Sequence, residues 1–199
     1  MSDLVDFLGV RLGLMIRWDT RSTGSKAAHE LKAHKSEINA VSFAPSSEWI
    51  LLTGSADNVS FVHQMRRQSK LIKQTVALWD IRKLSTKLHS FESHAGPVTQ
   101  VSWSPHLATH FASASEDRRI HIWNLDQIGA EQTPDDAEDG PPELMFVHGG
   151  HTSKPSDMSW SPAAKWHLAS TAEDNVLQVW EPSRHLRAEG GDVDPMELE

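Results

Sequence analysis

A motif that begins with histidine and ends with tryptophan recurs three times in this chain, and this recurrence limits the fold more than any other feature. Two copies, His94–Trp123 and His151–Trp180, have the same length and carry a proline, a serine and an aspartate at matching offsets. The third copy begins at His34, but its closing Trp79 comes 16 residues late. Self-similarity at a fixed period is typical of repeat architectures, so each copy should be one structural unit.

Each unit predicts the same series of short β-strands. An apolar alternation after the histidine indicates a half-buried strand, and Pro45, Pro105 or Pro162 ends it because proline cannot donate to a ladder. A second apolar strand, a turn with an aspartate and a third strand then lead to the tryptophan. Residues 86–91 and 143–147 supply a fourth strand, whereas no alternating run follows the last unit. Four antiparallel strands in a period of about 43 residues form a propeller blade, so we predict an all-β, partial β-propeller of about three blades.

A histidine, a hydroxyl residue and an aspartate in one unit invite comparison with a catalytic triad, but the pattern favours a structural role. The set occurs three times, and an active site is not normally triplicated within one chain. The histidine can instead bridge the aspartate turn and the hydroxyl, whose bond continues to the indole N–H and satisfies buried polar groups. We predict no catalytic residue, and the predicted structural residues are His34, Asp57 and Trp79, then His94, Asp117 and Trp123, then His151, Asp174 and Trp180.

Composition excludes several classes of protein. The absence of cysteine rules out disulfides and thiolate metal sites and fits a cytosolic or nuclear compartment. The net charge of −8 disfavours nucleic acid as the main ligand and suits a basic partner. No apolar run approaches the roughly 18 residues of a membrane span, and Met1–Leu14 does not have the form of a signal peptide. We therefore predict no direct nucleic acid ligand, no membrane association, no cofactor and no metal.

The late tryptophan of the first unit is explained by one unmatched segment, Val59–Gln74. Its removal joins Asn58 to Thr75 and gives SADNTVALW, the same length as SEDRRIHIW and AEDNVLQVW in the other units. Valine codons begin with GT and one glutamine codon ends in AG, so the segment can be an unspliced intron read in frame. The alternative is a genuine basic loop, because the segment carries four basic residues and no acid.

The connector after Trp123 is the second irregularity. Residues 125–150 form a longer connection than the one before, with acids at Glu131, Asp135, Asp136, Glu138 and Asp139 followed by Gly140-Pro141-Pro142. Such acidic runs are usually solvated loops. Here the run ends in a stiff Pro-Pro and an apolar stretch, an arrangement that can receive a basic amphipathic helix. We refer to residues 125–150 as the acidic proline loop.

The stretch DDAEDGPPELMFVHGGHT, with SFESH before it and AEDNVLQVW after it, closely resembles the nuclear WD-repeat histone chaperones. This is the retinoblastoma-binding family that includes the small subunit of chromatin assembly factor. The resemblance covers Leu14 to Trp180 apart from Val59–Gln74. Members have seven blades and are roughly twice this length, so the resemblance implies the C-terminal half of such a protein.

The resemblance also implies two binding sites. Asp136 and Asp139 match loop acids that hold an arginine of a histone helix, with Phe146 and Val147 on the apolar side and Pro141 and Pro142 in the loop. Glu37, Asn39 and Glu173 match residues that bind basic peptides on the propeller face, whereas Pro97 and Thr99 replace an acid and an aromatic there. The implied partners are core histones and subunits of chromatin assembly, deacetylase or methyltransferase complexes, in the nucleus.

These observations divide the chain into three parts. Residues 1–30 are expected to be the remnant of a preceding blade, 31–181 three repeats that include the 59–74 insertion and the acidic proline loop, and 182–199 an acidic tail. The predicted function is a non-enzymatic, histone-binding scaffold. The alternatives are a generic WD-repeat adaptor, as in ubiquitin ligase or signalling assemblies, and a non-functional truncated gene model.

Overall fold

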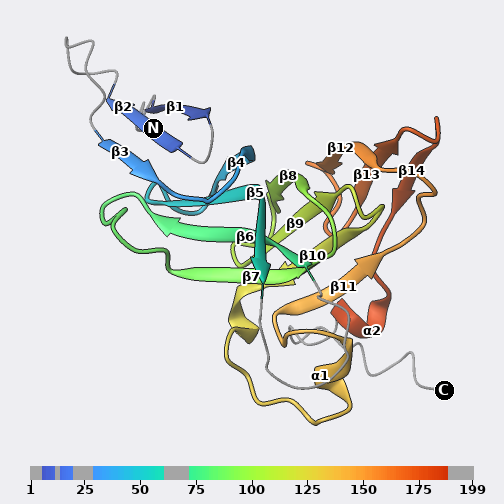
Figure 1. Ribbon diagram of the computed structural model, residues 1–199. Coiled ribbons are helices and arrows are strands. Elements are labelled where there is room, and N and C mark those ends of the chain that lie inside the picture. Colours follow the sequence, from blue (N-terminus) through green and yellow to red (C-terminus); the bar gives the residue numbers. More distant parts are fainter. Residues whose placement is uncertain (1–5, 12–13, 20–28, 61–71, 188–199) are drawn as a thin grey trace, which may run out of the picture.

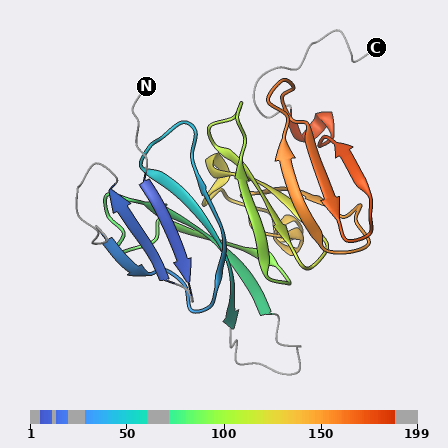
Figure 2. The ribbon, with the colours of Figure 1, turned by 90° about the horizontal axis from the view of Figure 1, so that it is seen from above.

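The computed structural model of the chain describes residues 6–11, 14–19, 29–60 and 72–187. They form four antiparallel sheets that follow one another in chain order as an arc (Figures 1 and 2). The first sheet holds β1 (Asp6–Arg11), β2 (Leu14–Asp19) and β3 (His29–Lys32). The second holds β4 (Ile38–Phe43), β5 (Ile50–Ser60), β6 (Ile72–Asp80) and β7 (His89–His94).

The other two sheets repeat this plan. The third sheet contains β8 (Val98–Trp103), β9 (His110–Ser115), β10 (Ile120–Asn124) and β11 (Leu144–His148). The fourth contains β12 (Pro155–Trp160), β13 (Leu168–Ala172) and β14 (Leu177–Trp180). The short helices are η1 (Leu125–Gln127), α1 (Asp136–Asp139) and α2 (Arg184–Arg187). The prediction of a partial all-β propeller is confirmed, including two four-stranded blades and a three-stranded last blade.

We call the sheets β4–β7, β8–β11 and β12–β14 the first, second and third blades. Strand β1 was not predicted, because its sequence DFLGVR has no counterpart in the repeated motif. Each first strand of a blade also contains a β-bulge, for example between Val98 and Gln100. A bulge adds one residue to one strand, which explains why the buried positions Val98, Val101 and Trp103 are spaced by three and then by two.

The hydrophobic core lies between neighbouring sheets. One apolar cluster joins the β1–β3 sheet to the first blade, the next joins the first and second blades, and the last joins the second and third blades. Trp103 and Trp160 are 6% and 7% exposed at these junctions, whereas Phe43 at the same repeat position is 39% exposed. Burial of the sheets against one another is therefore what holds the arc together.

The segment Val59–Gln74 is only partly described. Val59 pairs with Lys73 and Ser60 pairs with Ile72, so the two ends of the segment lengthen the hairpin of β5 and β6. The register shifts between Gly54 and Asn58, just before the segment begins. Residues 61–71 lie outside the described residues, and the interpretation of the segment as an insertion stays a prediction.

Candidate protein-interaction surfaces

Each blade contains the hydrogen-bond chain that the repeat pattern predicted. In the first blade, His34 Nδ1 lies 2.9 Å from Asp57 Oδ2, and His34 Nε2 lies 2.7 Å from the hydroxyl of Thr53. The indole of Trp79 donates to that same hydroxyl at 2.9 Å. A carboxylate only accepts, so the proton sits on Nδ1 and Nε2 accepts from the hydroxyl. This chain of hydrogen bonds ties strands β5 and β6 to the connector between β3 and β4.

The other two blades repeat the arrangement. The histidine lies 2.8 Å from a serine hydroxyl in both, and the indole of the closing tryptophan donates to the same hydroxyl at 2.8 Å and 3.0 Å. The histidine–aspartate distance is 2.9 Å in the second blade and 3.4 Å in the third. The residues of these two sets are His94, Ser113, Asp117 and Trp123, and His151, Ser170, Asp174 and Trp180. Both serine hydroxyls are buried and bonded on two sides, which suits a structural role.

The aspartates of these sets are held in their ionised form. Burial alone would raise the pKa of Asp57, but the hydrogen bonds from His34 and Thr75 lower it to about 2. Burial acts against Asp117 in the same way, and the bond from His94 lowers its pKa to about 2. These carboxylates contribute stability that is present above their ordinary pKa and is lost as the pH falls towards 2.

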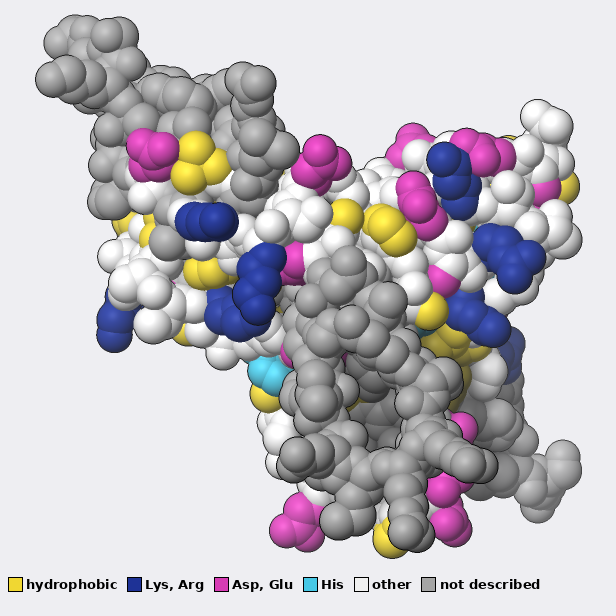
Figure 3. All heavy atoms as spheres, in the orientation of Figure 1, with side chains coloured by type: hydrophobic (Ala, Val, Ile, Leu, Met, Phe, Trp, Pro, Cys, Tyr) yellow, Lys and Arg dark blue, Asp and Glu magenta, His cyan; other side chains and the backbone are white. Residues whose placement is uncertain are grey.

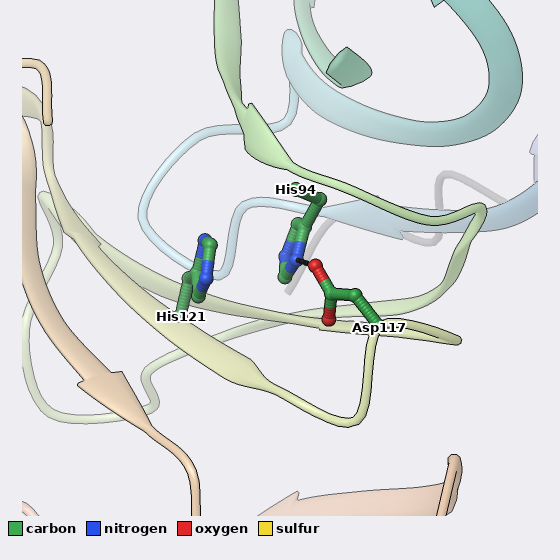
Figure 4. Close-up of side chains that lie close together, drawn as sticks. All are labelled: His94, Asp117 and His121. Atoms are coloured by element: carbon green, nitrogen blue, oxygen red, sulfur yellow. Dashed lines mark hydrogen bonds and ion pairs between the residues drawn. The ribbon is translucent and has the colours of Figure 1, made fainter. Parts of the chain in front are cut away.

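The second blade adds a buried histidine to its set, as Figure 4 shows. The ring of His121 stacks on that of His94 with centroids 3.7 Å apart and planes 9° apart. Burial and the neighbouring His94 lower the pKa of His121 to about 2. Ligand atoms of these rings and of Asp117 lie within 4.8 Å of one another, a spacing that would allow a metal ion. Lone pairs of imidazole lie in the ring plane, however, so two parallel rings do not converge on one ion.

The acidic proline loop is fixed to the blades at its end. Glu143 is 5% exposed, and its carboxylate accepts a hydrogen bond from His89 Nε2 of β7 at 2.9 Å. Its carbonyl accepts from the backbone N–H of Asn124, and the N–H of Leu144 donates to the carbonyl of Pro141, both at 2.9 Å. Leu144 packs on the apolar cluster between the first two blades. The loop therefore has a defined position on the scaffold.

The predicted loop acids lie on the outside of this anchored segment. Asp136 and Asp139 begin and end α1, and both are exposed, as are Glu131, Asp135 and Glu138. Thr133 donates from its hydroxyl to Asp136 Oδ2 at 2.7 Å, which orients that carboxylate. Figure 3 shows acidic side chains at the lower edge of the molecule, where α1 lies in Figure 1. No lysine or arginine occurs between Leu125 and Gly150, so the loop has no cation of its own.

The predicted apolar residues of this site point in different directions. Phe146 pairs with Ile122 and Val147 pairs with His121, and successive residues of a strand face opposite sides of the sheet. The ring of Phe146 packs on Trp180 of the third blade, with centroids 5.8 Å apart. Pro141 and Pro142 are half-buried at the end of the loop. Phe146 and Val147 therefore do not form one continuous apolar face.

A cleft beside the loop was not predicted from the sequence. It has a volume of about 410 Å³ and lies between β7 and the loop, with Glu92, Glu138 and Glu143 among its lining residues. Ser90 of β7 also lines it, and the hydroxyl of Ser90 is buried without a hydrogen-bond partner among the described residues. The two walls come from segments with no shared motif, which is why no sequence signal revealed the cleft.

The residues predicted for the propeller face do not bond to one another. The amide of Asn39 donates to the carbonyl of Val98 at 2.9 Å and so connects two blades. Glu37 is exposed, and Glu173 forms an exposed ion pair with Lys154 at 3.1 Å. The neighbouring acids Glu173 and Glu116 raise the pKa of Lys154. An acid of this face is thus already neutralised within the chain.

Comparison with protein families supplies the identity of the repeat. The WD domain, G-beta repeat, matches residues 25–62, 85–124 and 142–181, which together make up more than half of the chain. The chain belongs to the WD-repeat family. A chain in the crystal structure of a mitotic checkpoint complex is similar with a TM-score of 0.67 and 21% identity, a likeness that shows the fold. The match covers 90% of this WD-repeat chain and 46% of the solved chain, so this chain spans about half the length of that one.

WD-repeat propeller proteins bind partner proteins in complexes, so the surfaces of this chain are considered as candidate binding surfaces. Its two candidate surfaces are the acidic proline loop on the side of the blades and the propeller face. The helices of the described ranges are too short to reach across a bilayer. The hydrogen-bonded sets of histidine, hydroxyl, aspartate and tryptophan are buried inside the blades and stabilise the strands that carry these surfaces.

Proposed function

We propose that this WD-repeat chain is a non-enzymatic, histone-binding scaffold subunit of nuclear complexes that assemble or modify chromatin. Its partners would be core histones and subunits of chromatin assembly, deacetylase or methyltransferase complexes. The observation that supports this most is the acidic proline loop, which carries exposed acids on a segment fixed by Glu143 and His89. The close resemblance of the loop sequence to histone chaperones supplies the identity of the proposed partner.

The proposed contact is between Asp136 and Asp139 and an arginine of a histone helix. A hydrogen bond between charged groups contributes roughly 1.5–3 kcal/mol when it is shielded and close to nothing when it is fully solvated. The loop is already anchored, so binding does not need to order a long flexible segment first, which reduces the entropic cost. The cleft between β7 and the loop offers further carboxylates to a basic partner.

The propeller face is the second proposed surface and would hold a basic peptide near Glu37, Asn39 and Glu173. Its ligand must compete with Lys154 for Glu173, because these two side chains lie 3.1 Å apart. Both are about half exposed, so the ion pair is weak and can be displaced. Binding of a peptide to the propeller face would therefore depend more on how its cations are positioned against Glu37, Asn39 and Glu173 than on the net charge of the face.

A generic WD-repeat adaptor is the second candidate, and one observation favours it. Phe146 packs on Trp180 and Val147 faces the other side of the sheet, so the acids lack a continuous apolar neighbour. A site built from charge alone would accept many basic proteins rather than a particular histone helix. The two candidates therefore differ in selectivity.

Selectivity can be measured by immobilising the chain and applying core histones together with lysozyme, a basic protein that is not a histone. The histone-binding scaffold predicts that histones stay bound at salt concentrations that remove lysozyme. Elution of both proteins at the same salt concentration would reject the histone assignment and leave the generic adaptor. A column carrying the chain with all five acids of residues 131–139 changed to amides is the matched control and should release histones at a lower salt concentration than the wild-type column.

A further inference from the structure

His121 is a buried residue of the second blade that the repeated motif does not require. The equivalent positions are Ala77 in the first blade and Gln178 in the third, so the repeat accepts a small or a neutral polar side chain there. His121 is 2% exposed, and its Nδ1 is buried without a hydrogen-bond partner among the described residues. Most buried polar atoms in folded proteins have a partner, so this nitrogen calls for an explanation.

The groups that face His121 leave no free acceptor beside it. Its ring stacks on that of His94, the last residue of β7, with centroids 3.7 Å apart (Figure 4). The carboxylate of Asp117 already accepts hydrogen bonds from His94 Nδ1 and from the backbone N–H groups of Ala95 and Arg119. The charge of Arg119 disfavours a second positive charge here, whereas the charge of Asp117 favours it.

The neighbouring strands bring no further charge to His121. It lies opposite Ser113 of β9 and Val147 of β11. A neutral imidazole has one N–H and a protonated imidazole has two, so protonation inside the closed blade would create a buried donor with no acceptor. Burial and the neighbouring His94 are accordingly the main reasons why the pKa of His121 is low.

Strand β7 contacts the second blade at its start, its middle and its end. The contacts are the hydrogen bond of His89 to Glu143, the packing of Phe91 on Trp123 with centroids 5.2 Å apart, and the stack of His94 on His121. The first contact anchors the acidic proline loop, and the middle one lies in the apolar cluster between the first and second blades. Movement of β7 away from the second blade would therefore disturb all three contacts together.

We propose that β7 is an acid-sensitive latch between the first and second blades, which opens when His121 takes up a proton and then releases the anchor of the acidic proline loop. Opening brings the protonated ring into contact with water, which the closed junction excludes. The latch does not depend on which partner the loop binds.

The sign of the effect follows from the lowered pKa of His121 in the closed state. In the open state the pKa returns to its ordinary value of 6.5, so the open state binds the proton more tightly. The stability of the closed junction is thus fully present above that pH and is lost as the pH falls. The open fraction should rise about 25-fold between pH 7 and pH 5.

Thiol labelling tests this proposal, because the chain contains no cysteine and one introduced thiol reports opening at its own position. Val98→Cys lies in the apolar cluster between the first and second blades, and Ala114→Cys lies in the cluster between the second and third. Both positions are buried, at 0% and 1% exposure. Labelling with dithiodipyridine is measured relative to a short cysteine peptide at the same pH. From pH 7 to pH 5 the relative rate should rise about 25-fold for Val98→Cys and much less for Ala114→Cys.

The matched variant is His121→Gln, which introduces the residue that the third blade has at this position. In this background the acid-induced rise at Val98→Cys should disappear. Cleavage of the acidic proline loop by a glutamate-specific protease, relative to a free peptide of the same sequence, should increase on acidification in the wild type only. Val76→Cys, on the first-blade side of the same cluster, repeats the labelling if Val98→Cys does not fold. No rise in this cluster, an equal rise at Ala114→Cys, or a rise that persists in His121→Gln would overturn the proposal.

Discussion

Replacing Ser113 by alanine should cost more stability than the loss of a single hydroxyl normally does. The Ser113 hydroxyl lies 2.8 Å from His94 Nε2 and accepts the indole N–H of Trp123 at 2.8 Å. Both partners are buried, at 1% and 0% exposure, so water cannot replace the hydroxyl. Each buried polar group left unpaired costs roughly 1–3 kcal/mol. We therefore expect the free energy of unfolding to fall by about 3 kcal/mol in total, which lowers the Tm by roughly 6–12 °C in a protein of this size.

Ser170→Ala is the matched control within the same chain. Ser170 makes the same two bonds, but its partner Trp180 is partly exposed, so water can take the place of the hydroxyl. Its loss should therefore cost about half as much, on the order of 1.5 kcal/mol. Urea unfolding followed by tryptophan fluorescence gives both values, and the slope m should not change. A loss below about 1 kcal/mol for Ser113→Ala, or one no larger than for Ser170→Ala, would refute the role assigned to the hydroxyl.

Three further predictions concern other parts of the chain. Because the folded-state pKa of His121 is about 2, the unfolded chain binds an extra proton below pH 6.5, so stability should fall as the pH drops, by about 2 kcal/mol at pH 5. In unfolding experiments at several pH values, His121→Gln should lack this loss of stability, whereas exposed His106→Gln should retain it. An unchanged pH profile in His121→Gln would contradict the assignment of the loss to His121. Deletion of Val59–Gln74 should change the free energy of unfolding by less than about 1 kcal/mol, and a larger loss in denaturant unfolding would identify the segment as a structural element. Glu143→Ala should speed cleavage of the acidic proline loop by an acid-specific protease several-fold, whereas exposed Glu48→Ala should leave the rate unchanged, and equal rates would show that Glu143 does not anchor the loop.

The repeated parts of the fold could be predicted because the residues that satisfy the buried polar groups of a blade occur three times in the sequence. Each blade must satisfy a buried histidine, hydroxyl and indole, and the residues that do so recur at fixed offsets. The hydrogen-bond chain followed from this repetition, and the three strands of the last blade followed from the lack of an alternating run after Trp180. The β-bulge after Val98 did not, because a bulge changes the backbone register without requiring a particular residue.

The candidate sites were less predictable because their contacts join residues outside the repeat. His89 and Glu143 are 54 positions apart and lie outside the repeated motif, so the repeat pattern in the sequence could not predict the hydrogen bond between them. Neighbouring Phe146 and Val147 were expected on one apolar side, but the sheet sends them to opposite faces. Lys154 could not be assigned to Glu173 from sequence alone either, since the pairing depends on how the turn brings them together.

The histone contact that we propose depends on Asp136 and Asp139 of the acidic proline loop. The most direct measurement is a fluorescence anisotropy titration of a labelled peptide spanning the first helix of a core histone. Asp136→Asn with Asp139→Asn should weaken binding about tenfold or more, since about 1.4 kcal/mol is one decade. Glu131→Gln with Asp135→Asn removes the same charge and should do less, mainly altering the salt dependence. Equal losses from both pairs, each abolished by moderate salt, would contradict the claim and identify the loop as a diffuse acidic surface.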